Sequence, residues 1–188
     1  MSPLWSGRFE GDPDAALFEF GASLRFDRRL FEDDVRGSLA WAEALERASV
    51  LAPDESRAIR RALHEIRDEV LADTRIFDLP RARQDEDVHS FVERELVARV
   101  GEAGRRLHTG RSRNEQVSLD LRLYLKRRVP GLRHAIARLV ATLADQAAAS
   151  GDAVMPSYTH LRRAQPVAVA HYLLAHAAAT GCARRRCV

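Results

Sequence analysis

Apolar side chains recur at helical spacing along most of the chain. One stripe follows Asp27, which suits the N-cap of a helix, a second follows Pro53 and Asp54, and a third ends at Gly101. These stripes predict three amphipathic helices before residue 101. The stripe positions are Phe31, Val35, Leu39, Ala42 and Leu45, then Ile59, Leu63, Ile66 and Val70, and then Val88, Phe91, Leu96 and Val100.

A longer stripe predicts a fourth helix from near Ser112 to about residue 148, roughly 50 Å at ~1.5 Å per residue. Pro130 and Gly131 should kink it, because an internal proline removes one ladder hydrogen bond. A last helix should begin at Pro166. No segment alternates well enough to predict a strand. The predicted fold class is all-α, with an irregular arm over about residues 1–25 and long bundle helices whose apolar surface needs a partner or further sequence.

The charge balance narrows the classes of partner. The chain has 30 Lys and Arg against 27 Asp and Glu, and Arg184, Arg185 and Arg186 account for the whole excess. Nucleic-acid binding therefore ranks low. Both cysteines, Cys182 and Cys187, lie in the last eight residues, so the rest of the chain has no disulfide framework. With no apolar run of membrane-spanning length and no signal-like start, we expect a cytoplasmic protein without membrane contact.

The segment 107–116 carries the most chemical information. Gly110 permits a turn, and Ser112 and Glu115 have capping-box spacing at the start of the long helix. The first-turn amides of that helix, with Arg111, Arg113 and Asn114, suit an anion, and two guanidinium groups can bind planar carboxylates bidentately. The alternative is an ordinary helix start with solvated arginines.

Two histidines are further candidates for chemistry. His160 lies in a polar loop between two prolines, and imidazole transfers protons near neutral pH, although a lone loop histidine is more often structural. His89 opens a helix behind Asp85 and Asp87, where capping explains the acids and the imidazole can project into a pocket. His89 with these acids lacks the closed ligand set of a zinc site, so we expect no metal.

Five segments then match one family in order: residues 4–9, 22–27, 85–89, 109–114, and 158–161 with 164–167. With these segments the chain resembles argininosuccinate lyase, a member of the aspartase/fumarase superfamily that includes the δ-crystallins. The resemblance covers residues 4–176. It implies reversible elimination of argininosuccinate to arginine and fumarate, the last step of arginine biosynthesis, without metal or organic cofactor.

The resemblance also implies roles for residues. His160 corresponds to the family's proton-transfer histidine, and His89 lines and orients the site. The residues implied to contact substrate are Ser23, Ser112, Arg113, Asn114 and Thr159. Three positions depart from the family pattern: Glu115 replaces Asp, Ser157 replaces a Gly and should strain the backbone, and Arg162 replaces Gln and adds a charge near His160.

The same resemblance implies an organisation. Residues 1–110 correspond to the N-terminal lyase domain with its arm, residues 111–180 begin the central helical bundle, and residues 181–188 form an aberrant basic tail. The family assembles as a homotetramer whose sites draw on three subunits. Its mobile serine loop should lie about a hundred residues beyond residue 188, so we expect this polypeptide alone to be inactive.

Three alternatives stay open at this point. The first is a catalytically silent homologue, like the crystallins, and the second is another fumarate-producing lyase of the superfamily. The third is an arginine-rich helical nucleic-acid binder, which would need its arginines gathered on one face. Residues 1–180 instead mix them with equal numbers of acids.

Overall fold

The structure, a computed structural model, describes residues 14–80 and 82–186. The chain divides into two units, one ending at Tyr124 and one beginning at Leu125, and each is described by itself. The helices of the first unit are α1 (Ala15–Gly21), α2 (Leu24–Asp27), α3 (Phe31–Arg47), α4 (Pro53–Ala72), α5 (Val88–Val100) and α6 (Glu102–Arg106). Short 3-10 turns join them: η2 (Arg28–Leu30), η3 (Thr74–Asp78) and η4 (Ala82–Gln84). Helix α7 (Arg113–Ala149) begins in the first unit and continues into the second.

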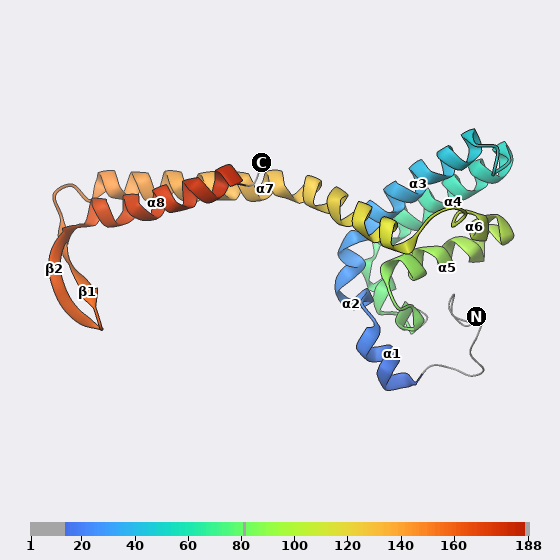
Figure 1. Cartoon of the computed structure of the whole chain (residues 1–188), viewed down its shortest axis with the longest axis horizontal. Helices are drawn as coiled ribbons and strands as arrows, with labels where there is room; N and C mark the ends of the chain where they lie inside the picture. Colours follow the sequence, from blue (N-terminus) through green and yellow to red (C-terminus); the bar gives the residue numbers. More distant parts are fainter. Residues whose placement is uncertain (1–13, 81, 187–188) are drawn as a thin grey trace. The chain divides into compact units, whose positions relative to one another are not determined.

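The core of the first unit lies where α3, α4 and α5 pack together (Figure 1). The stripe residues predicted for α3, α4 and α5 supply most of its buried side chains. Phe91 is fully buried and its ring contacts those of Phe31 and Phe77, at centroid distances of 6.3 and 4.8 Å. This arrangement confirms the mostly helical fold class and the amphipathic pattern behind it.

The start of α3 corrects one prediction. Asp27 is the last residue of α2, and Leu30 occupies the N-cap position of α3. The Asp27 carboxylate instead accepts the Val88 N–H at 3.1 Å and the Ser23 hydroxyl. The predicted irregular arm is also helical where it is described, in α1 and the start of α2, and its residues 1–13 lie outside the described residues.

A partly buried ion-pair network holds the segment that leads into α5. Arg94 donates to Asp85 at 2.7 Å and to Glu95 at 2.8 Å, and both carboxylates are at most 9% exposed. Asp87 then caps α5 by accepting the Ser90 N–H at 2.6 Å. These contacts fix the first turn of α5, where His89 lies.

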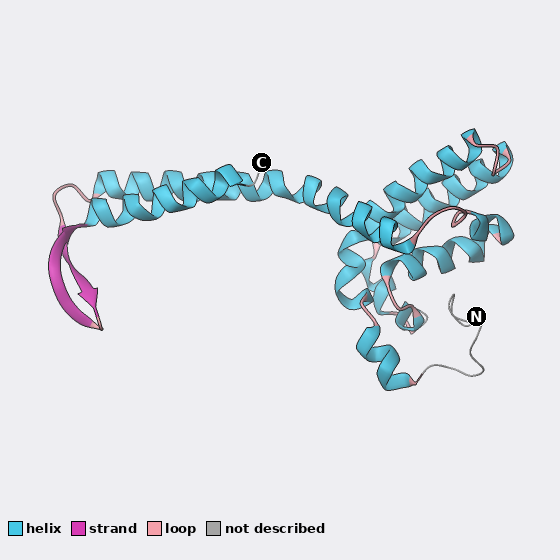
Figure 2. Cartoon of the chain, viewed as in Figure 1, coloured by secondary structure: helices cyan, strands magenta, loops and turns pink. Residues whose placement is uncertain are grey.

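The second unit contains a β-hairpin that the hydrophobic pattern did not predict (Figure 2). Strands β1 (Val154–Thr159) and β2 (Arg162–Ala168) pair antiparallel around a turn at His160 and Leu161. Both turn residues have positive φ, 48° and 62°, which matches the twist that two-residue hairpins require.

Helix α8 (Val169–Arg186) follows the hairpin and runs back in the direction from which α7 came (Figure 1). It therefore begins three residues later than predicted, because Pro166 belongs to β2, opposite Pro156. Helix α7 continues through Pro130, and its bounds are close to the predicted ones. No helix in the described ranges combines the length and apolarity needed to cross a membrane.

The aromatic core gives a test of this packing. Replacing Phe91 by Ala (Phe91→Ala) should lower the free energy of unfolding by about 3–5 kcal/mol, because it leaves a cavity in the core and removes the ring contacts with Phe31 and Phe77. Phe20→Ala is the matched control, since Phe20 is 87% exposed on α1, and it should stay within about 0.5 kcal/mol of the parent. Urea unfolding followed by circular dichroism measures both, and equal losses would contradict the described core.

Candidate active site

The N-terminus of α7 presents polar side chains at the surface of the first unit. Gly110 has φ +67°, a backbone conformation that residues with a side chain rarely adopt. Because glycine adopts it without strain, the chain can turn here into the helix. Ser112, which precedes α7, and Asn114, in its first turn, are exposed. Glu115 accepts the Ser112 N–H at 3.4 Å, which is one half of the predicted capping box. The first-turn amides and dipole of this 37-residue helix therefore favour an anion here.

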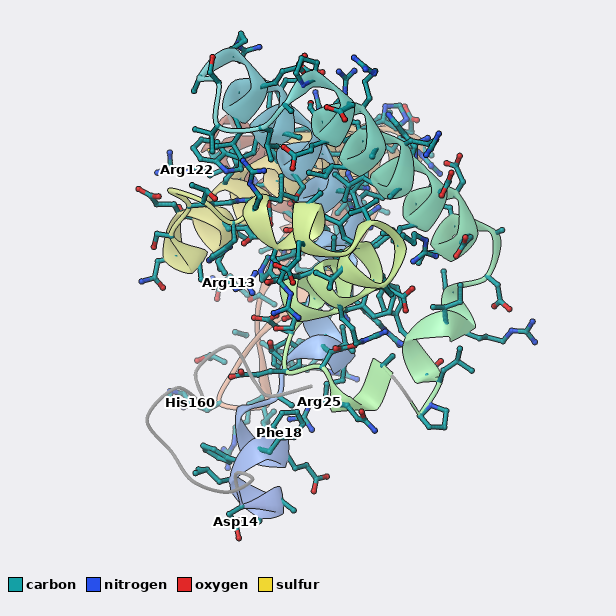
Figure 3. All side chains as sticks on the ribbon, turned by 90° about the vertical axis from the view of Figure 1, so that its right-hand side faces the viewer. Asp14, Phe18, Arg25, Arg113, Arg122 and His160 are labelled. Atoms are coloured by element: carbon teal, nitrogen blue, oxygen red, sulfur yellow. The ribbon has the colours of Figure 1, made fainter. Side chains whose placement is uncertain are left out.

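The side chain of Arg113 is held by hydrogen bonds to two partly buried or buried side chains (Arg113 is labelled in Figure 3). Its Nη1 donates to Gln116 Oε1 at 2.9 Å and its Nη2 donates to Glu93 Oε2 at 3.2 Å. The side chain is 15% exposed. Because a guanidinium has more N–H donors than these two acceptors use, a ligand carboxylate can still be bound.

Behind this arginine lies a buried cluster that joins three helices. Asp34 of α3 and Asp120 of α7 are fully buried, and His89 of α5 is 3% exposed. His89 Nδ1 lies 2.9 Å from Asp34 Oδ1 and 3.4 Å from Asp120 Oδ2. Gln116 Nε2 also donates to Asp34 Oδ1. A small cavity beside the cluster is lined by Asp34, His89, Glu93, Arg111, Arg113 and Gln116, among others.

The charges of the cluster follow from its contacts. Burial opposes ionisation of Asp34, but the hydrogen bonds and charges of His89, Gln116 and Arg111 outweigh it and lower its pKa. Burial also opposes the imidazolium of His89, yet the bond and charge of Asp34 raise its pKa. Burial and the adjacent Asp34 carboxylate raise the pKa of Asp120 to about 8. Near neutral pH Asp34 is therefore ionised while Asp120 keeps its proton.

The same residues are the group with metal-ligand spacing in the described part of the chain. Potential ligand atoms of Asp34, His89 and Asp120 lie within 4.8 Å of one another. The Arg111 guanidinium offsets part of their negative charge, and its Nη1 donates to Ser38 at 3.0 Å. Asp34 Oδ2 and both carboxylate oxygens of Asp120 have no hydrogen-bond partner among the described residues. The acids expected beside His89, Asp85 and Asp87, are occupied elsewhere, in the Arg94 network and as a helix cap.

Ser23 is bonded to the segment that leads into α5. Its N–H donates to the Glu86 carbonyl at 2.7 Å, and its hydroxyl donates to Asp27, which also accepts the Val88 N–H. Ser23 is therefore tied to the residues that open α5, one turn from His89.

Thr159 and His160 lie in the second unit, at the turn of the hairpin (His160 is labelled in Figure 3). Both are exposed, and Leu161 beside them is 99% exposed. The expected strain at Ser157 is wrong, since the positive φ values fall on the two turn residues instead. Ser157 lies at a register irregularity between Pro156 and Tyr158, and its hydroxyl donates to the Gln165 carbonyl at 2.8 Å.

Comparison with known proteins places this chain. The family described as Lyase matches residues 7–187. The chain belongs to the lyase family. An argininosuccinate lyase from Desulforudis audaxviator is 47% identical over 176 residues, which are 94% of this chain and 38% of the relative. One from Moorella thermoacetica is 44% identical over 92% of this chain and 36% of its own length. The resemblance to the aspartase/fumarase superfamily is thus confirmed, and the chain spans less than two fifths of these relatives.

Solved structures show the same fold for this lyase-family chain. An EDDS lyase variant with bound fumarate matches 90% of the chain at TM-score 0.67 and 24% identity, over 32% of its own length. A fumarate lyase from Mesorhizobium matches 95% of the chain at TM-score 0.60 and 22% identity, over 41% of its own length. At these identities the likeness concerns the fold alone.

Within the first unit of the lyase-family chain, His89 and Arg113 border one cavity, and Ser112 and Asn114 flank Arg113 in sequence. Thr159 and His160 belong to the other unit. Sequence reasoning missed Asp34, Gln116 and Asp120. The sequence does mark Asp34, which lies three residues after Phe31 on an otherwise apolar stripe. A charged residue on a buried face needs a polar partner.

Titration of the cluster should make the stability of the lyase-family chain depend on pH. The pKa of Asp120 is about 8 when folded and 3.8 ordinarily, so stability should fall as pH rises between these values. The raised pKa of His89 adds to that fall above its ordinary 6.5, whereas Asp34, with its lowered pKa, loses stabilisation only as pH falls below 3.8.

Asp120→Asn should remove most of the decline, up to about 1.4 kcal/mol per pH unit between about pH 5 and 8. Urea unfolding at several pH values, followed by tryptophan fluorescence, measures the slope. Asp68→Asn, at an exposed acid of α4, is the control and should keep the parent slope. A parent-like slope in the Asp120 variant would refute the assignment of the proton.

Proposed function

We propose that this chain provides part of the active site of an argininosuccinate lyase, which eliminates argininosuccinate to arginine and fumarate. The carrying observation is 47% identity over 94% of the chain to an argininosuccinate lyase. Arg113 supports the proposal, because its guanidinium is held at the N-terminus of a long helix, where carboxylates bind well.

In this proposal the residues divide between binding and proton transfer. Ser112, Arg113 and Asn114 hold a substrate carboxylate, and Ser23 and Thr159 add polar contacts. His160 transfers a proton in the elimination, because the leaving nitrogen must gain a proton. Removal of the proton beside the carboxylate builds negative charge, which fixed cations and hydrogen-bond donors stabilise. His89 orients the site from within.

We extend the proposal to the organisation of the protein. Residues 1–110 form the N-terminal lyase domain and residues 111–180 begin the central bundle. A homotetramer completes each site from three subunits. Exposed leucines on α7, among them Leu125, Leu132 and Leu139, are consistent with further helices packing there. The proposed location is the cytoplasm, and no metal or organic cofactor is required.

The purified 188-residue polypeptide should show negligible turnover. One positioned acid or base contributes about 10²–10⁴-fold to a rate, and the chain spans 38% of its relative's length. Fumarate formation, followed by its ultraviolet absorbance, is the measurement. Turnover near that of a full-length relative would contradict the expectation. The alternative lyases are distinguished by their substrates. A chimera of this chain with a full-length relative is assayed with argininosuccinate, adenylosuccinate, malate and aspartate.

A chimera tests the residue roles directly. The aligned 176 residues of this chain would replace their counterparts in the Desulforudis audaxviator relative. In an active chimera, His160→Asn should lower kcat by about 10²-fold or more. Arg113→Lys should lower kcat/KM for argininosuccinate by about tenfold or more, because lysine cannot bind a carboxylate bidentately.

Arg122→Lys is the matched control for the second substitution. Arg122 is exposed on the same helix as Arg113 and should keep the chimera's kcat/KM (labelled in Figure 3). If the two lysine variants behave alike, Arg113 does not bind substrate. If no variant of His160 or Arg113 lowers the activity of the chimera, the proposed roles are wrong.

A further inference from the structure

A continuous chain of hydrogen bonds runs from Arg113 into the protein. Arg113 Nη1 donates to Gln116 Oε1 at 2.9 Å, and Gln116 Nε2 donates to Asp34 Oδ1. His89 Nδ1 meets the same carboxylate oxygen at 2.9 Å. Gln116 is 4% exposed and Asp34 is fully buried. The guanidinium beside the exposed Ser112 and Asn114 is thus connected to a carboxylate inside the unit.

The direction of this chain is fixed by chemistry. A guanidinium only donates and an ionised carboxylate only accepts, so the amide between them must turn its oxygen to Arg113 and its nitrogen to Asp34. No other orientation of Gln116 satisfies both neighbours. The amide therefore transmits the fixed position of Asp34 to Arg113.

We propose that Gln116 and Asp34 are positioning residues, which hold the Arg113 guanidinium in the orientation that binds a substrate carboxylate. Neither residue touches substrate. The inference rests on the proposed function in assuming that Arg113 binds a carboxylate, and it adds the reason why this arginine is ready to bind before a ligand arrives. Preorganisation of this kind lowers the entropy cost of binding.

The position of Asp34 suits this task. It is anchored by donors from two other elements, His89 of α5 and Gln116 of α7, so it cannot rotate without breaking both bonds. Asp120 Oδ2 lies 3.4 Å from the same His89 Nδ1 and restricts the imidazole. Glu93 holds the other terminal nitrogen of Arg113 at 3.2 Å. The guanidinium is consequently fixed at two points, and only one of them is linked to the buried cluster.

The first experiment observes Arg113 itself in the 188-residue chain. Nitrogen-15 NMR at low temperature separates the Nη–H signals of a guanidinium whose rotation is hindered. We expect separated Arg113 signals in the parent and in Gln146→Leu, the control at an exposed glutamine of the same helix. Gln116→Leu should merge them, because leucine has a similar size and neither accepts nor donates.

Asp34→Asn is the second variant and keeps the experiment decisive if Gln116→Leu fails to fold. It retains the shape of the anchor but removes its charge, so the Arg113 signals should broaden or merge in a folded protein, as judged by the backbone amide spectrum. Persistent, separated Arg113 signals in either folded variant overturn the proposal.

The second experiment tests whether the positioning serves binding. Fumarate titrated into the chain should shift the Arg113 Nε signal, and Gln116→Leu should weaken that binding about tenfold, the effect of losing a hydrogen bond to a charged group. Combined with Arg113→Lys, in which fumarate binding is followed by the backbone amide shifts at the start of α7, the Gln116→Leu substitution should cause no further loss, because it acts through Arg113. Additive losses in the double variant overturn the positioning role.

The two proposals fail differently. If the parent chain gives no Arg113 response to fumarate, carboxylate binding at this arginine is contradicted, and the rotation of the guanidinium still decides the positioning role. If fumarate shifts Arg113 equally in the parent and in Gln116→Leu, the binding stands and the positioning role is refuted.

Discussion

The ionised carboxylate of Asp34, fully buried where α3, α5 and α7 meet, constrains the whole first unit. A buried charge is tolerated only when protein groups replace the water it has lost. Those groups come from distant parts of the chain, His89 on the first turn of α5 and Gln116 on the first turn of α7. Even Gly37 serves this junction, since a Cβ there would lie 3.3 Å from Asp120 Oδ1. Folding therefore brings the starts of two helices to one carboxylate, and the candidate binding surface is built on that arrangement.

The fold was predictable where burial alone decides structure. The stripes before residue 101 predicted α4 and α5 closely, because each helix hides one apolar face in a shared core. The hairpin was not predictable in this way. Its turn uses His160 and Leu161 where asparagine and glycine are usual, and its exposed strands carry prolines opposite each other. Asp27 shows another limit: it does accept a backbone N–H, but from Val88, which is 61 positions away.

The candidate site divides along a similar line. Local motifs identified Arg113 and its neighbours, because a helix start and an anion site have a recognisable spacing. The contacts that orient Arg113 were invisible, since Asp34 is separated from His89 by 55 positions and from Gln116 by 82. Periodicity assigns a residue to a face of a helix but does not say which polar groups from other helices will meet it. Polar residues on apolar stripes are the useful warning, because their burial requires a partner.

Arg113 and His160 are consequently held by different physical means. Arg113 is oriented by side-chain bonds that end in a buried network, so its geometry is set before any ligand arrives. His160 is placed by backbone geometry, in a left-handed turn that costs conformational energy. Within the described residues no side-chain hydrogen bond holds its ring. The turn fixes where the imidazole is attached, and groups outside the hairpin must orient it. In the proposed function, Arg113 is therefore oriented by this chain's own side chains, whereas His160 needs neighbouring groups to hold its ring within hydrogen-bond reach of the substrate atom.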